Sequence, residues 1–168
     1  LWIPIKAGSD NILAMSVIYE ILNAKMYKPA FAKTYTDLPF LVRVDTKKLL
    51  RRSEVEKAKD EKEHHSFDEQ FYAWNAKTNA PAVMPGSEGS EHKTLRLSDF
   101  GIEPLLEGEF EVTLLSGEKV KVTTVFEMLK KSTARFSPEA TQKETGVHPD
   151  TVRQLARDIA LPKVVEIT

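Results

Sequence analysis

Residues 10–26 carry apolar side chains at the spacing of an α-helix over a wide arc, and this feature constrains the fold most strongly. One stripe holds Ile12, Met15, Ile18 with Tyr19, and Leu22, and a second stripe beside it holds Leu13, Val17 and Ile21. Ser9 or Asp10 suits the N-cap, and Pro29 limits the far end near Met26 or Tyr27. An apolar arc of this width indicates a helix that packs on more than one side.

Both ends of the chain place a strand pattern next to a helix pattern. Residues 1–5 form a short apolar run, and a polar loop at 6–10 leads into the first helix. Near the other end, Ser137-Pro138-Glu139 and Gly146 are the start and stop signals of a short helix. A second helix opens at Pro149-Asp150, and residues 164–167 look like the start of a strand. We therefore expect Rossmann-like strand–helix elements at both ends.

The middle of the chain alternates apolar and polar residues, which is typical of antiparallel hairpins. Hairpins are predicted over 40–50, 71–84 and 110–123, and Gly117 supplies the positive φ that the third turn needs. Thr123 or Thr124 is expected to cap a helix that starts at Val125. The expected class is α/β with inserted hairpins, incomplete as an isolated domain. We divide it into a cofactor-loop strand and helix (1–36), a hairpin-rich insertion (37–123) and a helical return to the sheet (124–168).

Composition excludes several classes of protein. The 168 residues contain no cysteine, which excludes a disulfide scaffold, an iron–sulfur cluster held within the segment and a thiol nucleophile. The net charge is −1, whereas proteins that bind nucleic acids carry an excess of basic side chains, so no nucleic acid is expected as a partner. Apolar runs are shorter than the roughly 20 residues of a membrane span, so no direct membrane insertion is expected. Because the chain opens on Leu1 rather than methionine, we interpret it as a piece of a longer protein.

The chain lacks a P-loop, a dinucleotide-binding glycine motif, a metalloprotease helix and a nucleophile elbow. Its informative feature is Gly8-Ser9-Asp10, between an expected strand end and a helix N-terminus, where ligands bind in open α/β sheets. Gly8 would let the backbone approach closely, Ser9 would offer a hydroxyl and a cap, and Asp10 would offer a fixed carboxylate. A carboxylate can accept two parallel hydrogen bonds from the N1–H and the exocyclic amine of a guanine or pterin ring. The alternative is that Ser9 or Asp10 only caps the helix.

Other candidates each allow two interpretations. Three aromatic residues could line a substrate funnel or pack within strands, namely Phe71, Tyr72 and Trp74. Three arginines could steer an anion or form a solvated hairpin rim, namely Arg43, Arg51 and Arg52. We interpret the charged stretch 53–63 and the adjacent His64-His65 as surface.

Motifs at both ends and in the middle resemble one family. The N-terminal segments are WIPIKAGSDNILAM (2–15) and YKPAFAKTYT (27–36), and the C-terminal ones are FSPE (136–139), TGV (145–147) and VRQLAR (152–157). In this order they resemble the molybdopterin oxidoreductase (DMSO reductase) family. Residues 35–43 and 122–126 resemble the subgroup that contains respiratory nitrate reductase, nitrite oxidoreductase, and chlorate, selenate and ethylbenzene enzymes.

The resemblance implies an internal segment of a catalytic subunit that carries a molybdenum bis(molybdopterin guanine dinucleotide) cofactor. Gly8, Ser9 and Asp10 match the residues that contact the guanosine end of one dinucleotide. A 4Fe–4S cluster and the molybdenum ligand would lie outside this segment, so no catalytic residue or metal ligand is assigned, and neither Asp37 nor Asp45 is a candidate.

The implied chemistry is two-electron oxygen-atom transfer on a small oxyanion, with nitrite oxidation or nitrate reduction as the first expectation. The implied partners are the remainder of the catalytic subunit and an iron–sulfur beta subunit. The compartment stays open between a periplasm-like one and the cytoplasmic face of a membrane. A different hypothesis is a free-standing binding or scaffold module without a redox cofactor. An isolated nucleotide-binding domain is disfavoured because no phosphate-cradling glycine loop is present.

Overall fold

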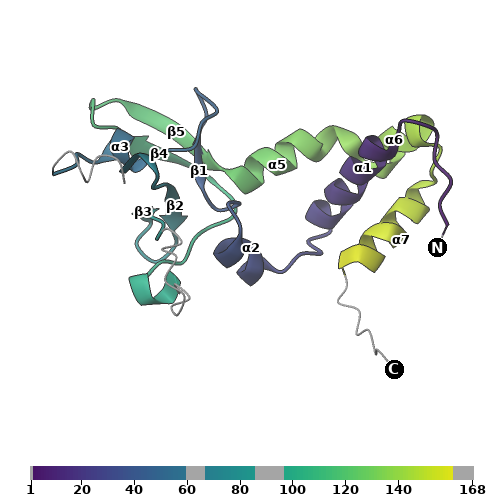
Figure 1. Ribbon diagram of the computed structural model, residues 1–168, viewed down its shortest axis with the longest axis horizontal. Coiled ribbons are helices and arrows are strands. Elements are labelled where there is room, and N and C mark those ends of the chain that lie inside the picture. The colour runs from purple at the N-terminus through teal and green to yellow at the C-terminus, as the bar shows by residue number, and fades with distance from the viewer. Residues whose placement is uncertain (1, 60–66, 86–96, 161–168) are drawn as a thin grey trace. The chain divides into compact units, whose positions relative to one another are not determined.

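The computed structural model describes residues 2–59, 67–85 and 97–160. The chain divides into two compact units, which we describe separately (Figure 1). Unit one comprises residues 1–28 and 129–168, and unit two comprises residues 29–128. The mixture of helices and small antiparallel sheets confirms the expected α/β class.

Unit one is built from helices. It contains α1 (Asp10–Asn23), the second half of α5 (Val125–Thr133), the 3₁₀ turn η2 (Ala134–Phe136), α6 (Pro138–Thr145) and α7 (Pro149–Ala160). α1 packs against both α6 and α7, so the wide apolar arc of this helix is used on two sides as expected (Figure 1). The core consists of Val17, Val147, Val152 and Ala156, with Leu13, Ile21 and Leu155 packed around it.

Helix ends in unit one follow the local signals in the sequence. The Ser137 hydroxyl accepts a hydrogen bond from the Ala140 amide at 3.3 Å, and Pro138 occupies the first turn of α6. Gly146 ends α6 in the left-handed conformation at φ 76°, as its position predicts. α1 ends at Asn23, earlier than expected, and Lys25 just beyond it has a positive φ of 53°.

The strand expected at residues 1–5 is wrong over residues 2–5, because that part of the chain has no regular secondary structure. A strand needs a partner strand to satisfy its backbone, and the neighbour here is a helix end: the Lys6 amide donates to the Thr145 carbonyl oxygen at 3.0 Å. The second expected strand, at 164–167, lies outside the described residues. In the described part of the chain, all strands belong to unit two.

Unit two contains two antiparallel sheets. Strands β1 (Leu41–Arg43), β4 (Glu109–Thr113) and β5 (Lys119–Thr124) form a sheet in the order β1-β5-β4, and β2 (Tyr72–Asn75) pairs with β3 (Ala80–Val83). The unit also contains helices α2 (Pro29–Tyr35) and α3 (Arg52–Val55), the 3₁₀ turn η1 (Leu97–Phe100) and the start of α5.

The hairpin predictions at 71–84 and 110–123 are confirmed by the β2–β3 and β4–β5 ladders. Gly117 has a φ of 83° in the second of these turns. The predicted hairpin at 40–50 is present as a turn with a single bridge, Val42 to Leu49, while the main partner of β1 is β5. Thr124 begins α5 as expected, because its hydroxyl accepts from the Glu127 amide at 3.1 Å.

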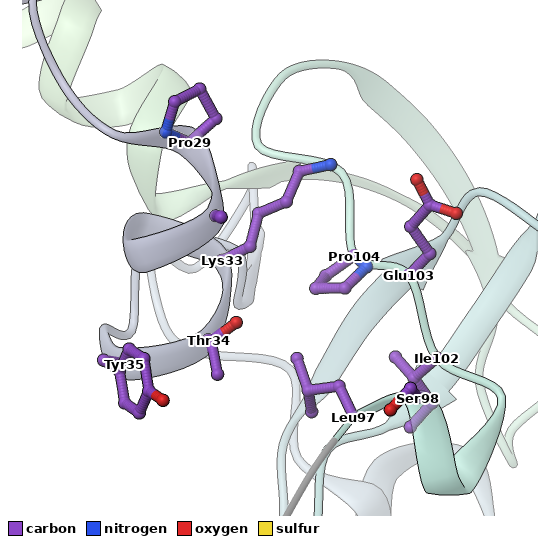
Figure 2. Close-up of a pocket in the computed structure, with 10 residues that line it drawn as sticks. Pro29, Lys33, Thr34, Tyr35, Leu97, Ser98, Ile102, Glu103 and Pro104 are labelled. Atoms are coloured by element: carbon purple, nitrogen blue, oxygen red, sulfur yellow. The ribbon is translucent and has the colours of Figure 1, made fainter.

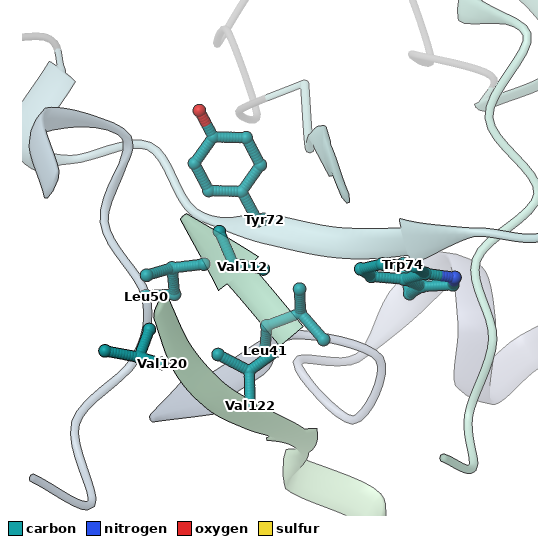
Figure 3. Close-up of a cluster of buried hydrophobic side chains, with 7 residues drawn as sticks. All are labelled: Leu41, Leu50, Tyr72, Trp74, Val112, Val120 and Val122. Atoms are coloured by element: carbon teal, nitrogen blue, oxygen red, sulfur yellow. The ribbon is translucent and has the colours of Figure 1, made fainter. Parts of the chain in front are cut away.

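The main core of unit two lies between its two sheets and the segment after β1 (Figure 3). Its buried members are Leu41, Leu50, Tyr72, Trp74, Val112, Val120 and Val122. The Trp74 ring stacks on Phe110 with centroids 4.2 Å apart and planes inclined by 5°. Tyr72 and Trp74 are therefore core residues, which favours the packing interpretation over an aromatic funnel.

Candidate functional site

Gly8, Ser9 and Asp10 form the loop that opens α1 in unit one. Gly8 has a φ of 78°, and a Cβ built there would meet no described atom within 4 Å, so the glycine is needed for its backbone conformation and borders open space. Ser9 is 4% exposed, whereas Asp10 is exposed. Among the described residues, the Asp10 carboxylate has no hydrogen-bond or ion-pair partner. The loop thus presents one unpaired carboxylate to its surroundings.

Ser9 occupies the N-cap position of α1, yet its side chain does not cap the helix. Its hydroxyl instead donates backwards to the Lys6 carbonyl oxygen at 2.7 Å, and its amide donates to the same oxygen at 3.2 Å. The capping alternative is therefore not realised by the Ser9 side chain. The expectation that Ser9 offers its hydroxyl to a ligand also changes, because its single proton is already donated within the loop.

The loop is tied to the C-terminal end of α6. Besides the Lys6 amide bond to Thr145, the Lys6 ammonium donates to the Lys143 carbonyl oxygen at 2.7 Å. The last carbonyls of a helix lack intrahelical partners and carry partial negative charge, so a cation is favourable there. The sequence offers no signal for this contact, because the two residues lie 137 positions apart.

Buried hydroxyls tie α6 to α1 in turn. Ser16 on α1 is 0% exposed, and its Oγ lies 3.1 Å from the Oγ1 of Thr141, which is 3% exposed. Thr145 is also fully buried, and its hydroxyl donates to the Thr141 carbonyl oxygen at 3.0 Å. Buried polar groups are costly unless paired, so the contact between Ser16 and Thr141 fixes the position of α6 against α1, while the bond from Thr145 pairs a buried hydroxyl within α6.

Arg153 of α7 adds a charged clamp at the surface of unit one. It donates to the Glu139 carboxylate of α6 and, at 3.1 Å, to Asp150, and it lies 3.9 Å from the carboxylate of Glu20 on α1. The hydrogen bond from Arg153 lowers the pKa of Glu139. Arg153 therefore connects α7 with α6 and α1.

The arginines of unit two are occupied by local partners. Arg43 pairs with Asp45 at 2.6 Å and with Glu54 at 2.5 Å, and the hydrogen bond from Arg43 lowers the pKa of Asp45 to about 2. Arg52 pairs with Glu56 at 2.8 Å. Arg51 donates to the Asp68 carbonyl oxygen. This arrangement favours the rim interpretation over anion steering, since the carboxylates cancel much of the positive charge. His64-His65 lie outside the described residues.

Unit two also contains a pocket of about 660 Å³ that the sequence did not indicate. It lies between α2 and the segment around η1, and Figure 2 shows Lys33 extending from α2 toward Glu103 and Pro104. The remaining lining is mostly apolar or uncharged and includes Leu97, Ser98 and Ile102. The pocket forms from segments that are far apart in the chain, so no local sequence motif predicts it.

The described ranges contain neither a metal-binding cluster nor a membrane-spanning helix. No group of three or more His, Cys, Asp or Glu side chains within them is arranged to hold a metal ion. No helix within them combines the length and hydrophobicity that crossing a bilayer requires.

Comparison with known proteins identifies relatives over nearly the whole chain, although no family model matches. The chain is 43% identical over 97% of its length to the alpha subunit of dimethylsulfide dehydrogenase from Rhodovulum sulfidophilum, and 44% identical over 99% to that of chlorate reductase from Ideonella dechloratans. It is 29% identical over 95% to the alpha subunit of respiratory nitrate reductase from Haloferax mediterranei. These alignments cover 16%, 17% and 16% of the three relatives, so the chain spans about a sixth of their length.

Proposed function

Since the chain belongs to the molybdopterin oxidoreductase family, whose alpha subunits it matches over nearly its whole length, we propose that it is part of a molybdoenzyme catalytic subunit. Within that subunit, we propose that Gly8-Ser9-Asp10 holds the guanosine end of a molybdopterin guanine dinucleotide. The observation that carries this role is the exposed Asp10 carboxylate, which has no partner among the described residues and stands on a loop anchored at both sides.

The donors and acceptors of this loop fit a guanine ring. An ionised carboxylate has two acceptor oxygens, which match the N1–H and the 2-amino group of guanine, and this geometry gives two parallel charge-assisted hydrogen bonds. Gly8 leaves the adjacent side open, because even a Cβ there would meet no described atom within 4 Å. The Asp10 and Asn11 amides, in the first turn of α1, donate to no acceptor in the described part of the chain. They are available to a second polar group of the nucleoside.

When bound, the molybdenum cofactor supplies two-electron oxygen-atom transfer, while this segment binds and orients the nucleoside end of the cofactor. The metal ligand and a 4Fe–4S cluster would come from the remainder of the catalytic subunit, and an iron–sulfur beta subunit would exchange the electrons.

For the substrate we propose a small oxyanion. Two of the relatives are named for the oxyanions chlorate and nitrate, whereas the third is named for dimethylsulfide, a neutral thioether; identity is higher to the chlorate and dimethylsulfide enzymes than to the nitrate reductase. The narrower form of the proposal is nitrate reduction, which the relative at 29% identity supports, or the reverse reaction, nitrite oxidation.

The test is Asp10→Asn in the intact subunit, with guanosine and molybdenum measured per polypeptide. Asparagine keeps the volume but replaces one acceptor oxygen by a donor amide, which should weaken binding of the guanosine end by roughly 10- to 100-fold. Glu144→Gln is the matched control, because Glu144 is an exposed carboxylate of the same unit without a described partner. Loss of guanosine and molybdenum in Asp10→Asn alone supports the role. Equal contents in both variants would refute it.

A further inference from the structure

The Ser9 hydroxyl is directed into the loop rather than toward its open side. Ser9 is 4% exposed, and both its hydroxyl and its amide donate to the Lys6 carbonyl oxygen, at 2.7 and 3.2 Å. These two bonds close residues 6–9 into a turn, in which Gly8 takes the positive φ of 78°. The neighbouring Asp10 begins α1 directly after this turn. The direction of the Asp10 carboxylate therefore depends on how the turn is closed.

Lys6 fixes the outer end of the same turn on α6. Its amide bonds the Thr145 carbonyl oxygen at 3.0 Å, and its ammonium bonds the Lys143 carbonyl oxygen at 2.7 Å. The Lys6 stem lies over Gly146, since a Cβ built on that glycine would be 3.5 Å from Lys6 Cγ. The carbonyls of the last helical turn are thus engaged by Lys6, and its ammonium is drawn toward α6.

The two helices that flank this turn are also joined to each other directly. The buried contact between Ser16 and Thr141 joins α1 to α6, so the two helices that bracket the loop are held together independently of the loop. Because α1 and α6 are joined in this way, we expect substitutions within residues 6–9 to change the loop rather than the two helices.

We propose that Ser9 and Lys6 are positioning residues that hold the Asp10 carboxylate in the direction needed to recognise guanine, and that neither residue contacts the nucleoside. This inference rests on the proposed function of Asp10. It assigns different roles within the motif. Asp10 binds the guanine base, whereas Ser9, together with Lys6 before the motif, holds Asp10 in position. A ligand role for Ser9 would instead need its hydroxyl on the open side of the loop.

The experiment measures dissociation constants of GMP and IMP by calorimetry on the cofactor-free intact subunit. IMP lacks the 2-amino group, so the ratio of the two constants reports whether both carboxylate oxygens engage the base. The parent protein should prefer GMP by about tenfold, the worth of one hydrogen bond to a charged group. Loss of fold alone would weaken the binding of both nucleotides equally and leave the ratio of their dissociation constants unchanged.

Ser9→Ala removes the buried closing bond and should reduce the preference for GMP by about fivefold. Lys6→Met keeps the stem over Gly146 and removes the ammonium, and it should reduce the preference by about threefold. Lys6→Arg should restore the preference because it retains a cation at the helix end. Lys28→Met is the charge-matched control, since Lys28 is exposed in the same unit and has no described partner.

The outcomes separate the two proposals. A reduced GMP preference in Ser9→Ala and Lys6→Met, with rescue by Lys6→Arg and no change in thermal unfolding, supports the positioning role. An unchanged preference in Ser9→Ala and Lys6→Met, while Asp10→Asn abolishes it, overturns the positioning role and leaves the proposed function standing. A preference that survives Asp10→Asn overturns the proposed function and, with it, this inference.

Discussion

Thr141→Val tests the buried contact that holds α6 against α1. Valine matches threonine in shape and in β-branching, so the substitution removes the hydroxyl with little change in packing or helix propensity. Ser16 is 0% exposed, and in the described part of the chain Thr141 Oγ1 is its hydrogen-bond partner at 3.1 Å. The loss of one neutral hydrogen bond and the burial of an unpaired Ser16 hydroxyl should together cost about 2 kcal/mol.

The reciprocal change, Ser16→Ala, should cost less. Thr141 Oγ1 also lies 3.1 Å from the Ser137 carbonyl oxygen, so its hydroxyl keeps a partner when Ser16 is replaced. Alanine also has the higher helix propensity, which offsets part of the loss by about 0.5 kcal/mol. The double variant should cost less than the sum of the two single variants, because no hydroxyl is then left unpaired, and a coupling of about 1 kcal/mol is expected.

Native-state hydrogen exchange is the suitable assay, because it reads unit one separately and does not require the two units to unfold together. A cost of about 2 kcal/mol should speed exchange of α1 and α6 amides by roughly 30-fold in Thr141→Val. Exchange in β4 and β5 is the internal reference, since both strands belong to unit two. Equal effects of the two single variants, or strictly additive effects in the double variant, would refute the assigned hydrogen-bond network.

Two further predictions concern the ends and the surface of the fold. Gly146→Ala should destabilise α6 by about 1 kcal/mol because an L-residue is strained at φ 76°, whereas Gly146→Asn should cost less; equal exchange rates in both variants would contradict this. Asp45, whose pKa Arg43 lowers to about 2, stabilises the fold at pH values above its unfolded pKa of roughly 3.9, and this contribution is lost as pH falls through 2. Arg43→Gln should bring the pKa of Asp45 back toward 3.9 in an NMR titration, and a value that stays near 2 would show that Arg43 is not the cause.

Local signals account for what the sequence predicts well. Ser137 with Pro138 starts α6, Gly146 ends it, and Gly117 turns β4 into β5, because each of these features depends on a few consecutive residues. The same holds for Gly8, whose positive φ matches its expected place in a loop.

Long-range contacts explain what the sequence does not predict. The expected strand before the loop is absent over residues 2–5, and the adjoining residue Lys6 bonds to the end of α6, a partner far away in sequence. Ser9 turns inward through a local bond, from its hydroxyl to the Lys6 carbonyl oxygen three residues earlier, so a residue that resembles a ligand or a cap becomes part of a support. Composition and periodicity contain no information on which carbonyl a hydroxyl will meet. The pocket beside Lys33 is unforeseen for the same reason.

An experimental structure of the intact, cofactor-loaded subunit would test the central claim most directly. The measurement is the pair of distances from the two Asp10 carboxylate oxygens to N1 and to the 2-amino nitrogen of guanine. Charge-assisted hydrogen bonds require both distances to be about 2.7–2.9 Å, with the Ser9 hydroxyl still on the Lys6 carbonyl oxygen. If other residues made the hydrogen bonds to the guanine ring and Asp10 faced solvent, the account would be contradicted.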